Sequence, residues 1–317
     1  MYTLKQKPED FIVKEISTVK FTTSGRYAYV LVKKENRNTL DVVKQISRQL
    51  GVPEKKVGFA GTKDKHAITE QMMSIYSVGK DKVEKLNIEN VSVELKGFGD
   101  IPISLGDLDG NKFEIVVRDY SEKVEETDFV VNYFDEQRFG GKNEKIGKAI
   151  IKKDFKKACE LLRLLVVRND YIGSLNKISL RMLRFYVHAY QSYLWNETVS
   201  EYLMKFDVVK EVEYKLGKLV FVKEKVDAKI PLIGFDSSLV VGEFSEIIKE
   251  IMKKEEITHR DFIIKQIPDL SVEGELRDVC VDVKDLVIER LDESSVRLSF
   301  VLGKSSYATM VVKRILV

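Results

Sequence analysis

The chain has 317 residues, enough for one large domain or two medium ones with a sizeable core. Hydrophobic residues make up 44% and charged residues 32%, which is typical of a globular protein, and no apolar run approaches membrane-spanning length. The formal net charge of +3 neither requires nor excludes RNA as a partner, because the distribution of charge matters more than its sum.

Cysteine use and the first residues indicate a compartment. The two cysteines, Cys159 and Cys280, are far apart and belong to no Cys-x-x-Cys pair. This argues for a reducing compartment, and so for the cytoplasm, and against a disulfide framework or a zinc site. Residues 1–7 contain no apolar signal-peptide core, so we expect no secretion signal.

The first part of the chain is predicted to be rich in strands, with one clear helix. Asn38 and Thr39 provide an N-cap signal, and apolar residues recur with a helical period up to Leu50, before Gly51 ends the helix. Asp109-Gly110-Asn111 is a turn signal, so we expect a hairpin turn there and a strand after it, up to residue 118. Strands rich in β-formers are predicted over residues 11–16, 26–33, 72–78 and 91–95.

Helices dominate from about residue 143, and strands return after Gly274. Asp154 is suited to cap the second of these helices. The helical segments are predicted over residues 145–152, 154–167, 179–205 and 243–254. Short strands are predicted over residues 212–222, 230–233 and 239–241, and the closing strands over residues 279–283, 286–291, 296–302 and 308–316. A mixed block between two strand-rich blocks suggests an inserted domain.

A cluster of charged side chains follows the short apolar run that begins at Val57, which we expect to be a buried strand. Asp64 stands between Lys63 and Lys65, with His66 beside them. Flanking cations favour an ionised carboxylate, and such a group at a strand end is a natural nucleophile or general base. Taken alone, the composition of the segment favours an exposed polar turn, and it favours a hydrogen-bonded surface or core histidine over a metal ligand for His66. The glycine spacing is not that of a P-loop.

Residues 131–140 place aromatic side chains, amides and an arginine in one short polar segment. Aromatic rings stack on unpaired bases and amides read their edges, so this mixture suits nucleobase recognition. The alternative is a loop whose aromatic residues anchor it to the core. A second aromatic run over residues 185–196 has helical spacing, so we assign Tyr186, Tyr190 and Trp195 to the core.

A basic cluster lies around residue 154. It consists of Lys152, Lys153, Lys156 and Lys157. A solvated helix face is the common meaning of such a cluster, and a phosphate-contacting patch is the alternative.

Six segments of the chain, taken in order, resemble motifs of the TruD family of tRNA pseudouridine synthases. Residues 5–15, 57–71, 106–118, 131–140, 185–196 and 303–309 carry the resemblance, which thus covers nearly the whole chain. The family's catalytic motif is matched at Gly61, Lys63, Asp64, Lys65, Ala67, Thr69 and Gln71. One departure is Asp135, where the family usually has glycine, and we interpret it as local variation.

The resemblance implies an α+β fold. Its core is a pseudouridine synthase core with a mixed, largely antiparallel sheet and flanking helices, interrupted by an inserted α+β domain. We expect the first part of the catalytic domain over residues 1–154, the inserted domain over residues 155–270, and the closing strands of the catalytic domain over residues 271–317.

The resemblance also implies a reaction and a set of site residues. Asp64 would start cleavage of the N-glycosidic bond of a flipped-out uridine, U13 of tRNA, by covalent attack or by elimination, and the base would rejoin through C5. Lys5 would pair with Asp64 and keep it ionised. Asn132 would hold the base edge and Arg138 would contact phosphate. The pocket walls would be Phe11, Phe134 and Tyr307. We expect tRNA as the partner, a monomer, and no metal or cofactor.

Two other functions are compatible with the same residues. A non-catalytic RNA-binding protein could have this fold, although it would not need the Lys5 and Asp64 pair. A glycoside-cleaving hydrolase usually needs two carboxylates that face each other across the bond, and Glu70 or Asp135 could be offered as the second.

Overall fold

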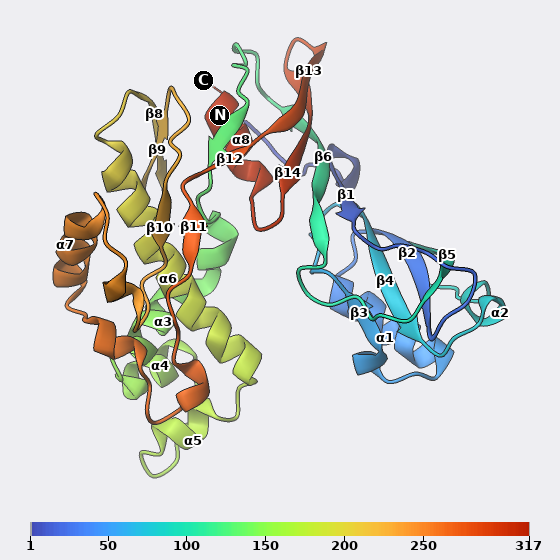
Figure 1. The fold of residues 1–317 in the computed structure, drawn as a ribbon, viewed down its shortest axis with the longest axis horizontal. Coiled ribbons are helices and arrows are strands. Elements are labelled where there is room, and N and C mark those ends of the chain that lie inside the picture. The colour runs from blue at the N-terminus through green and yellow to red at the C-terminus, as the bar shows by residue number, and fades with distance from the viewer. Residues whose placement is uncertain (1, 317) are drawn as a thin grey trace. The chain divides into compact units, whose positions relative to one another are not determined.

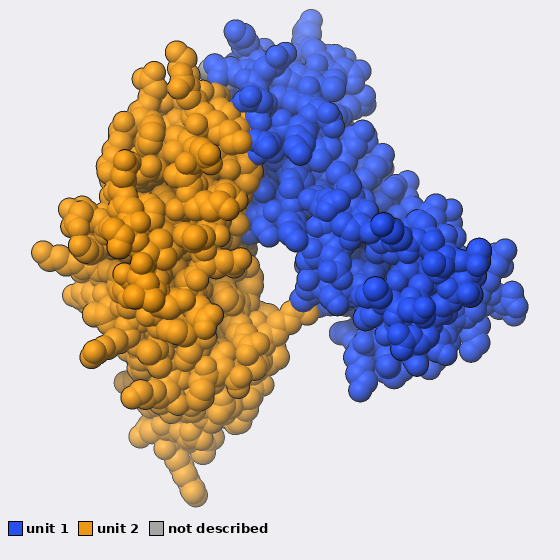
Figure 2. All heavy atoms as spheres, viewed as in Figure 1, with its two compact units in different colours: residues 1–128, 282–308, 315–317 blue, residues 129–281, 309–314 orange. Residues whose placement is uncertain are grey.

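The structure, a computed structural model, describes residues 2–316, which form two compact units (Figure 2). The first unit consists of Met1–Asp128, Asp282–Ala308 and Ile315–Val317, and the second of Phe129–Val281 and Thr309–Arg314. The beginning and the end of the chain thus belong to one unit, although the second unit lies between them in the sequence. The assignment of residues 1–154, 155–270 and 271–317 to a catalytic and an inserted domain stays a prediction. Within residues 2–316, no helix has both the length and the apolar character of a membrane span.

The first unit is built on a mixed, eight-stranded sheet with the strand order β13-β14-β6-β1-β4-β2-β5, and β3 pairs with β4 (Figure 1). β1 and β4 run parallel, and the other strand pairs are antiparallel. The expected α+β fold with a largely antiparallel sheet is therefore confirmed. The strands are β1 (Phe11–Ser17), β2 (Tyr27–Glu35), β3 (Val57–Phe59), β4 (Ile68–Tyr76), β5 (Val91–Gly99), β6 (Leu108–Arg118), β13 (Lys284–Asp292) and β14 (Ser295–Gly303).

Helix α1 (Thr39–Leu50) covers one face of this sheet, as Figure 1 shows. The predicted cap is confirmed, because the Asn38 side chain accepts a hydrogen bond from the backbone of Leu40 at 2.9 Å, and Gly51 closes the helix in the left-handed region at φ +69°. A short helix, α2 (Lys80–Val83), follows β4. The core under α1 contains the apolar residues Val30, Val32, Val42, Val43, Ile46, Met73 and Ile75.

The second unit is organised around α6 (Leu180–Leu203), the predicted long helix. Trp195 is fully buried on it and donates its indole N–H to the carbonyl of Ile230 at 3.1 Å, and Tyr190 is also buried, which confirms these two core assignments. Tyr186, the third residue assigned to the core, is only partly buried. The other helices are α3 (Asn143–Ile151), α4 (Phe155–Leu161), α5 (Tyr171–Leu175) and α7 (Ser245–Glu255). The strand pairs are β8 (Val208–Tyr214) with β9 (Gly217–Val222), β10 (Lys229–Pro231) with β11 (Leu276–Asp278), and β7 (Phe129–Val131) with β12 (Cys280–Asp282).

Expected elements were wrong in three places. The short strand expected over residues 239–241 does not form, because Ser237–Leu239 is a 3-10 helix and no strand covers these residues. Residues 308–316 form a helix, α8 (Ala308–Ile315), where a strand was expected. The run is rich in β-branched residues and buried along most of its length, and periodicity does not separate strand from helix in so short an apolar segment. The triplet Asp109-Gly110-Asn111 lies inside β6 and not in a turn. Gly110 is needed there for close approach, because a Cβ atom would lie 2.2 Å from the carbonyl oxygen of Leu302 on β14.

Candidate active site

The segment before β1 is anchored so that Lys5 is presented at the sheet. The carboxylate of Asp10 accepts two hydrogen bonds from the guanidinium of Arg118, at 2.9 and 2.6 Å, and one from the backbone N–H of Lys7 at 3.0 Å. The Arg118 hydrogen bonds lower the pKa of Asp10. Thr3 also forms a bridge with Arg118 through backbone hydrogen bonds of 2.9 and 3.0 Å. Between these anchors, Lys5 adopts a positive φ of 56°.

Lys5, Phe11 and Asp64 come together in the first unit. The Lys5 ammonium lies 3.1 Å from Oδ1 of Asp64 and 4.0 Å from the centroid of the Phe11 ring. Phe11 is buried, with its ring edge against Phe113. The side chains of Lys5 and Asp64 are 19% and 32% exposed, so the pair is partly desolvated and still accessible to a substrate.

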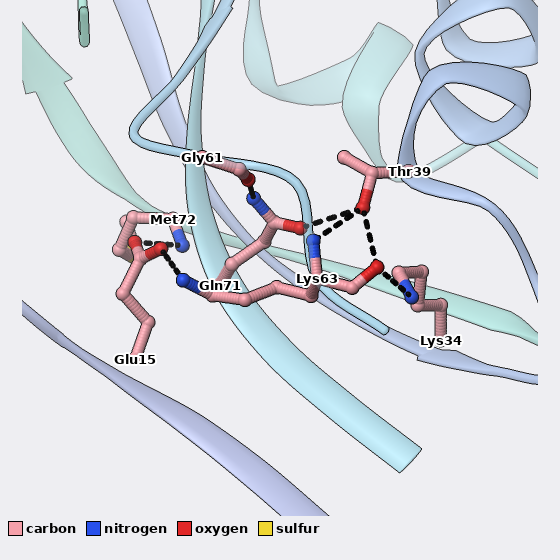
Figure 3. A network of polar contacts seen from close by, with 7 residues as sticks. All are labelled: Glu15, Lys34, Thr39, Gly61, Lys63, Gln71 and Met72. Carbon is pink, nitrogen blue, oxygen red and sulfur yellow. Dashed lines mark hydrogen bonds and ion pairs between the residues drawn. The ribbon is translucent and has the colours of Figure 1, made fainter. Parts of the chain in front are cut away.

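The loop that carries Asp64 is fixed by polar contacts from α1 and β4 (Figure 3). The amide of Gln71 donates to the carbonyl of Gly61 at 2.9 Å. The hydroxyl of Thr39 accepts from the backbone N–H of Lys63 at 3.0 Å, and its proton is shared between Oε1 of Gln71 at 3.3 Å and the carbonyl of Lys63 at 3.4 Å. The matched motif residue Gln71 therefore holds the loop that carries Asp64.

Lys63 turns away from Asp64 and pairs with Glu15 on β1 at 2.8 Å. Both side chains are nearly excluded from solvent, at 7% and 1% exposure, and Glu15 also accepts from the backbone N–H of Met72 at 3.1 Å (Figure 3). Lys65 and His66 are exposed. Lys5, which is distant in sequence, thus makes the ion pair with Asp64, whereas the flanking Lys63 pairs with Glu15.

Lys34 on β2 is a buried contact of Asp64 that the sequence reasoning missed. It is 1% exposed, and its ammonium donates to the backbone carbonyl of Asp64 at 2.6 Å and to that of Lys63 at 3.4 Å. Burial lowers the pKa of Lys34 to about 8, the Asp64 carboxylate opposes this shift, and Lys63 adds to it. Strand alternation contained the signal, because Lys34 continues the inward positions Val30 and Val32.

Asn132, Phe134 and Arg138 form a separate group in the second unit. Asn132 accepts from the guanidinium of Arg277 through its side-chain oxygen at 2.7 Å and through its backbone oxygen at 2.8 Å, and its amide donates to the carbonyl of Asp278 at 3.3 Å. Arg277, on β11, was not among the predicted site residues. No motif pointed to it, because its role depends on contacts with residues far away in the sequence.

The ring of Phe134 is held between cations and an indole. The guanidinium carbon of Arg277 lies 4.2 Å from the Phe134 ring centroid and that of Arg138 lies 5.7 Å from it, while the Trp195 ring packs edge-on at 5.7 Å. The backbone of Phe134 exchanges two hydrogen bonds with the side chain of Asn196, at 3.0 and 2.9 Å. Phe134 is 9% exposed, so most of its surface already contacts protein.

Tyr307 belongs to the first unit and lies between β14 and α8, where it is half-buried. β14 ends at Gly303, which pairs with Gly110 on β6, whereas Phe11 pairs with Ile115 on that strand. The sheet register by itself therefore does not bring Tyr307 next to Phe11, and its place at the site stays a prediction.

The family model for tRNA pseudouridine synthase D (TruD) matches residues 2–164 and 159–315, which together span almost the whole chain. The chain belongs to this family. Membership of this family indicates that the protein is an RNA pseudouridine synthase, an enzyme that isomerises uridine in tRNA.

Relatives of this TruD chain are similar to it over most of their length. It is 29% identical to tRNA pseudouridine synthase D of Aquifex aeolicus, over 98% of this chain and 97% of that protein. It is 32% identical to the protein named "Probable tRNA pseudouridine synthase D 2" of Methanocaldococcus jannaschii, over 98% and 90%. A crystal structure from Methanosarcina mazei that carries the TruD name matches with a TM-score of 0.72 and 26% identity, over 99% and 93% of the two chains.

The basic cluster of this TruD chain is largely neutralised within the second unit. Lys152 pairs with Glu256 at 3.0 Å, Lys153 with Asp261 at 3.2 Å, and Lys157 with Glu160 at 3.6 Å. These ion pairs favour a solvated helix face over a phosphate-contacting patch.

Proposed function

We propose that this protein is a tRNA pseudouridine synthase that isomerises the uridine at position 13, and that Asp64 starts the reaction. The supporting observation is the ion pair formed by Lys5 and Asp64, which is 3.1 Å long and partly exposed. The backbone of the loop that carries Asp64 is held by hydrogen bonds from Thr39 and Lys34. A carboxylate needs a positioned cation to stay ionised in a partly dry site, and it needs open space on its other side to reach a nucleotide. Asp64 has both features.

The proposed reaction uses few protein groups. The bond between N1 of uracil and C1′ of ribose breaks, and its electrons stay on the uracil. The base then turns over, C5 bonds to C1′, the proton on C5 is lost, and N1 gains a proton, so that the product is an isomer of the substrate. Asp64 could attack C1′ directly or take part in an elimination across the ribose, and both mechanisms agree with its position beside Lys5. We assign Lys5 the role of holding the Asp64 carboxylate ionised and in one orientation.

We propose that the aromatic residues and amides of the matched motifs recognise the flipped-out uracil. Phe11 supports this role because its ring already packs under Lys5. In the second unit, Arg277 and Asn196 hold Asn132 and Phe134 in fixed orientations, which would limit the ordering cost on binding a base. Tyr307 and Arg138 keep their proposed roles as a ring contact and a phosphate contact.

The test is pseudouridine formation in a tRNA transcript, with a second transcript in which the uridine at position 13 is replaced by cytidine. We expect the protein to modify the first transcript only. Asp64→Asn keeps the size of the side chain and loses its charge, so turnover should fall by several orders of magnitude while tRNA affinity changes little. Asp81→Asn, on the exposed surface of α2, serves as the matched control and should behave as the parent protein. An Asp64→Asn variant with activity within about tenfold of the parent would rule out this role.

A further inference from the structure

The loop of Asp64 rests on a buried positive charge. The Lys34 ammonium donates to two successive backbone carbonyls of this loop, that of Lys63 at 3.4 Å (Figure 3) and that of Asp64 at 2.6 Å. A buried ammonium is costly unless it has strong acceptors. Here the acceptors are peptide oxygens of the loop itself, and the nearby carboxylates have other partners: Glu15 binds Lys63, and the Asp64 carboxylate binds Lys5.

This arrangement fixes the direction in which Asp64 points. The peptides on both sides of its Cα atom are held by one Nζ atom, so the backbone angles of Asp64 are restrained. Thr39 secures the N–H of Lys63, one residue earlier. With its backbone fixed on both sides, the side chain of Asp64 has few orientations left, and one of them meets Lys5.

We propose that Lys34 is a positioning residue for the reaction: it holds the backbone of Asp64 from the buried side of the sheet so that the carboxylate stays paired with Lys5 and aimed at the substrate. This inference rests on the proposed role of Asp64. Lys34 contacts neither the carboxylate of Asp64 nor the substrate, so its contribution would be to geometry and local charge.

The charged groups that act on Lys34 come from the loop above it, namely the carboxylate of Asp64 and the ammonium of Lys63. On the neighbouring strands, Thr69 of β4 and Val91 of β5 lie opposite Lys34, and Thr39 of α1 binds the same carbonyl of Lys63; none of these three side chains titrates. Because the pKa of Lys34 is about 8, its charge is lost as the pH rises through that value. The neutral amine still donates hydrogen bonds, but the positive charge beneath Asp64 disappears.

The experiment compares Lys34→Met, which removes donors and charge, with Lys34→Gln, which keeps a donor and removes the charge. Lys33→Met is the matched control, because Lys33 is the next residue on β2, is exposed, and pairs with Glu70 at 3.7 Å. The single-turnover rate at saturating tRNA, the tRNA affinity and the melting temperature are measured from pH 6 to 9.5.

We expect Lys34→Met to lower the single-turnover rate by roughly 100-fold at pH 7, the cost of a slightly misplaced catalytic group, with tRNA affinity unchanged. Lys34→Gln should lose less, and Lys33→Met should match the parent. The parent rate should decline above about pH 8. This decline should be absent in both Lys34 variants.

Parent-like rates in both Lys34 variants would overturn the inference, and so would an unaltered alkaline decline in them. A loss of rate that only follows the loss of folded protein would indicate a structural role and would overturn it too. If Lys34→Met fails to fold, the single-turnover rate of Lys34→Gln and the pH profile of the parent test the inference instead. The result for Asp64→Asn separates the two hypotheses: an active Asp64→Asn removes the proposed function, whereas an inactive Asp64→Asn with normal Lys34 variants removes only this inference.

Discussion

Two lysines close to Asp64 are buried in different ways. Lys63 has a carboxylate partner, Glu15, at 2.8 Å, whereas Lys34 has only peptide oxygens. An ammonium without a carboxylate partner keeps its charge less readily, because dipoles replace its hydration only in part. Burial of the Lys34 ammonium is the main cause of its low pKa. At neutral pH the protein therefore carries an energetically unfavourable buried positive charge next to its candidate catalytic residue. Groups with such perturbed pKa values are often found at functional sites.

The burial of Lys34 predicts an unusual pH dependence of stability. Its pKa is about 8 in the folded protein and 10.5 is the ordinary value, so below pH 8 both states are protonated and the cost is fully present. Between these values the unfolded chain binds more protons, so the free energy of unfolding rises with pH. The parent should gain on the order of 3 kcal/mol relative to Lys34→Met over this range. Urea unfolding of both proteins at pH 7 and pH 10 measures the difference, and a constant difference would contradict the prediction.

At the level of elements, sequence signals were reliable where local chemistry determines the structure. The cap of α1 at Asn38 and its end at Gly51 are local, and so is the cap of α4 at Asp154. The sequence signals failed where contacts with a neighbouring strand or helix determine the local structure. Gly110 has the sequence context of a turn but is required by the backbone of β14, and the apolar run of α8 lacks a clear period. Such residues are set by tertiary contacts that no local pattern records.

Close helix packing in the second unit depends on Gly147 of α3. A Cβ atom there would lie 2.0 Å from the carbonyl oxygen of Tyr186 on α6, so Gly147→Ala must push the two helices apart. We expect a loss of roughly 1–3 kcal/mol in the free energy of unfolding, despite the better helix propensity of alanine. Gly303→Ala is the control, since nothing lies within 4 Å of its Cβ position. Denaturant unfolding of the parent and both variants measures the effect. Equal stabilities would show that α3 and α6 can accommodate the extra methyl group without moving apart.

For the whole molecule, the family and the α+β fold could be predicted because six motifs are spread over the chain in order, and the comparisons confirm both. The pairing of Lys5 with Asp64 followed from the same motifs, and the structure contains it. Lys34 and Arg277 could not be found in this way. Each acts by contacting the backbone or side chain of a motif residue that is distant in sequence, Asp64 for Lys34 and Asn132 for Arg277. The supporting contacts of a site are three-dimensional, and a motif lists only the residues it contains.

Charge distribution over the molecule leads to a prediction about tRNA binding. Lys152, Lys153 and Lys157 each face a carboxylate, so the basic cluster around residue 154 offers little net charge to a phosphate backbone. Replacing these three lysines and Lys156 by glutamine should therefore leave the slope of log affinity against log salt changed by less than about one.

The control for that measurement is Lys65→Gln, because Lys65 is exposed and adjacent to Asp64. Neutralising one lysine that contacts a phosphate lowers the slope by roughly 0.7–0.9, so this single change should have as large an effect as the four changes together. Binding titrations of a tRNA transcript at several salt concentrations give both slopes. A fall of about three in the quadruple variant would mean that its lysines exchange their carboxylate partners for phosphates when tRNA binds.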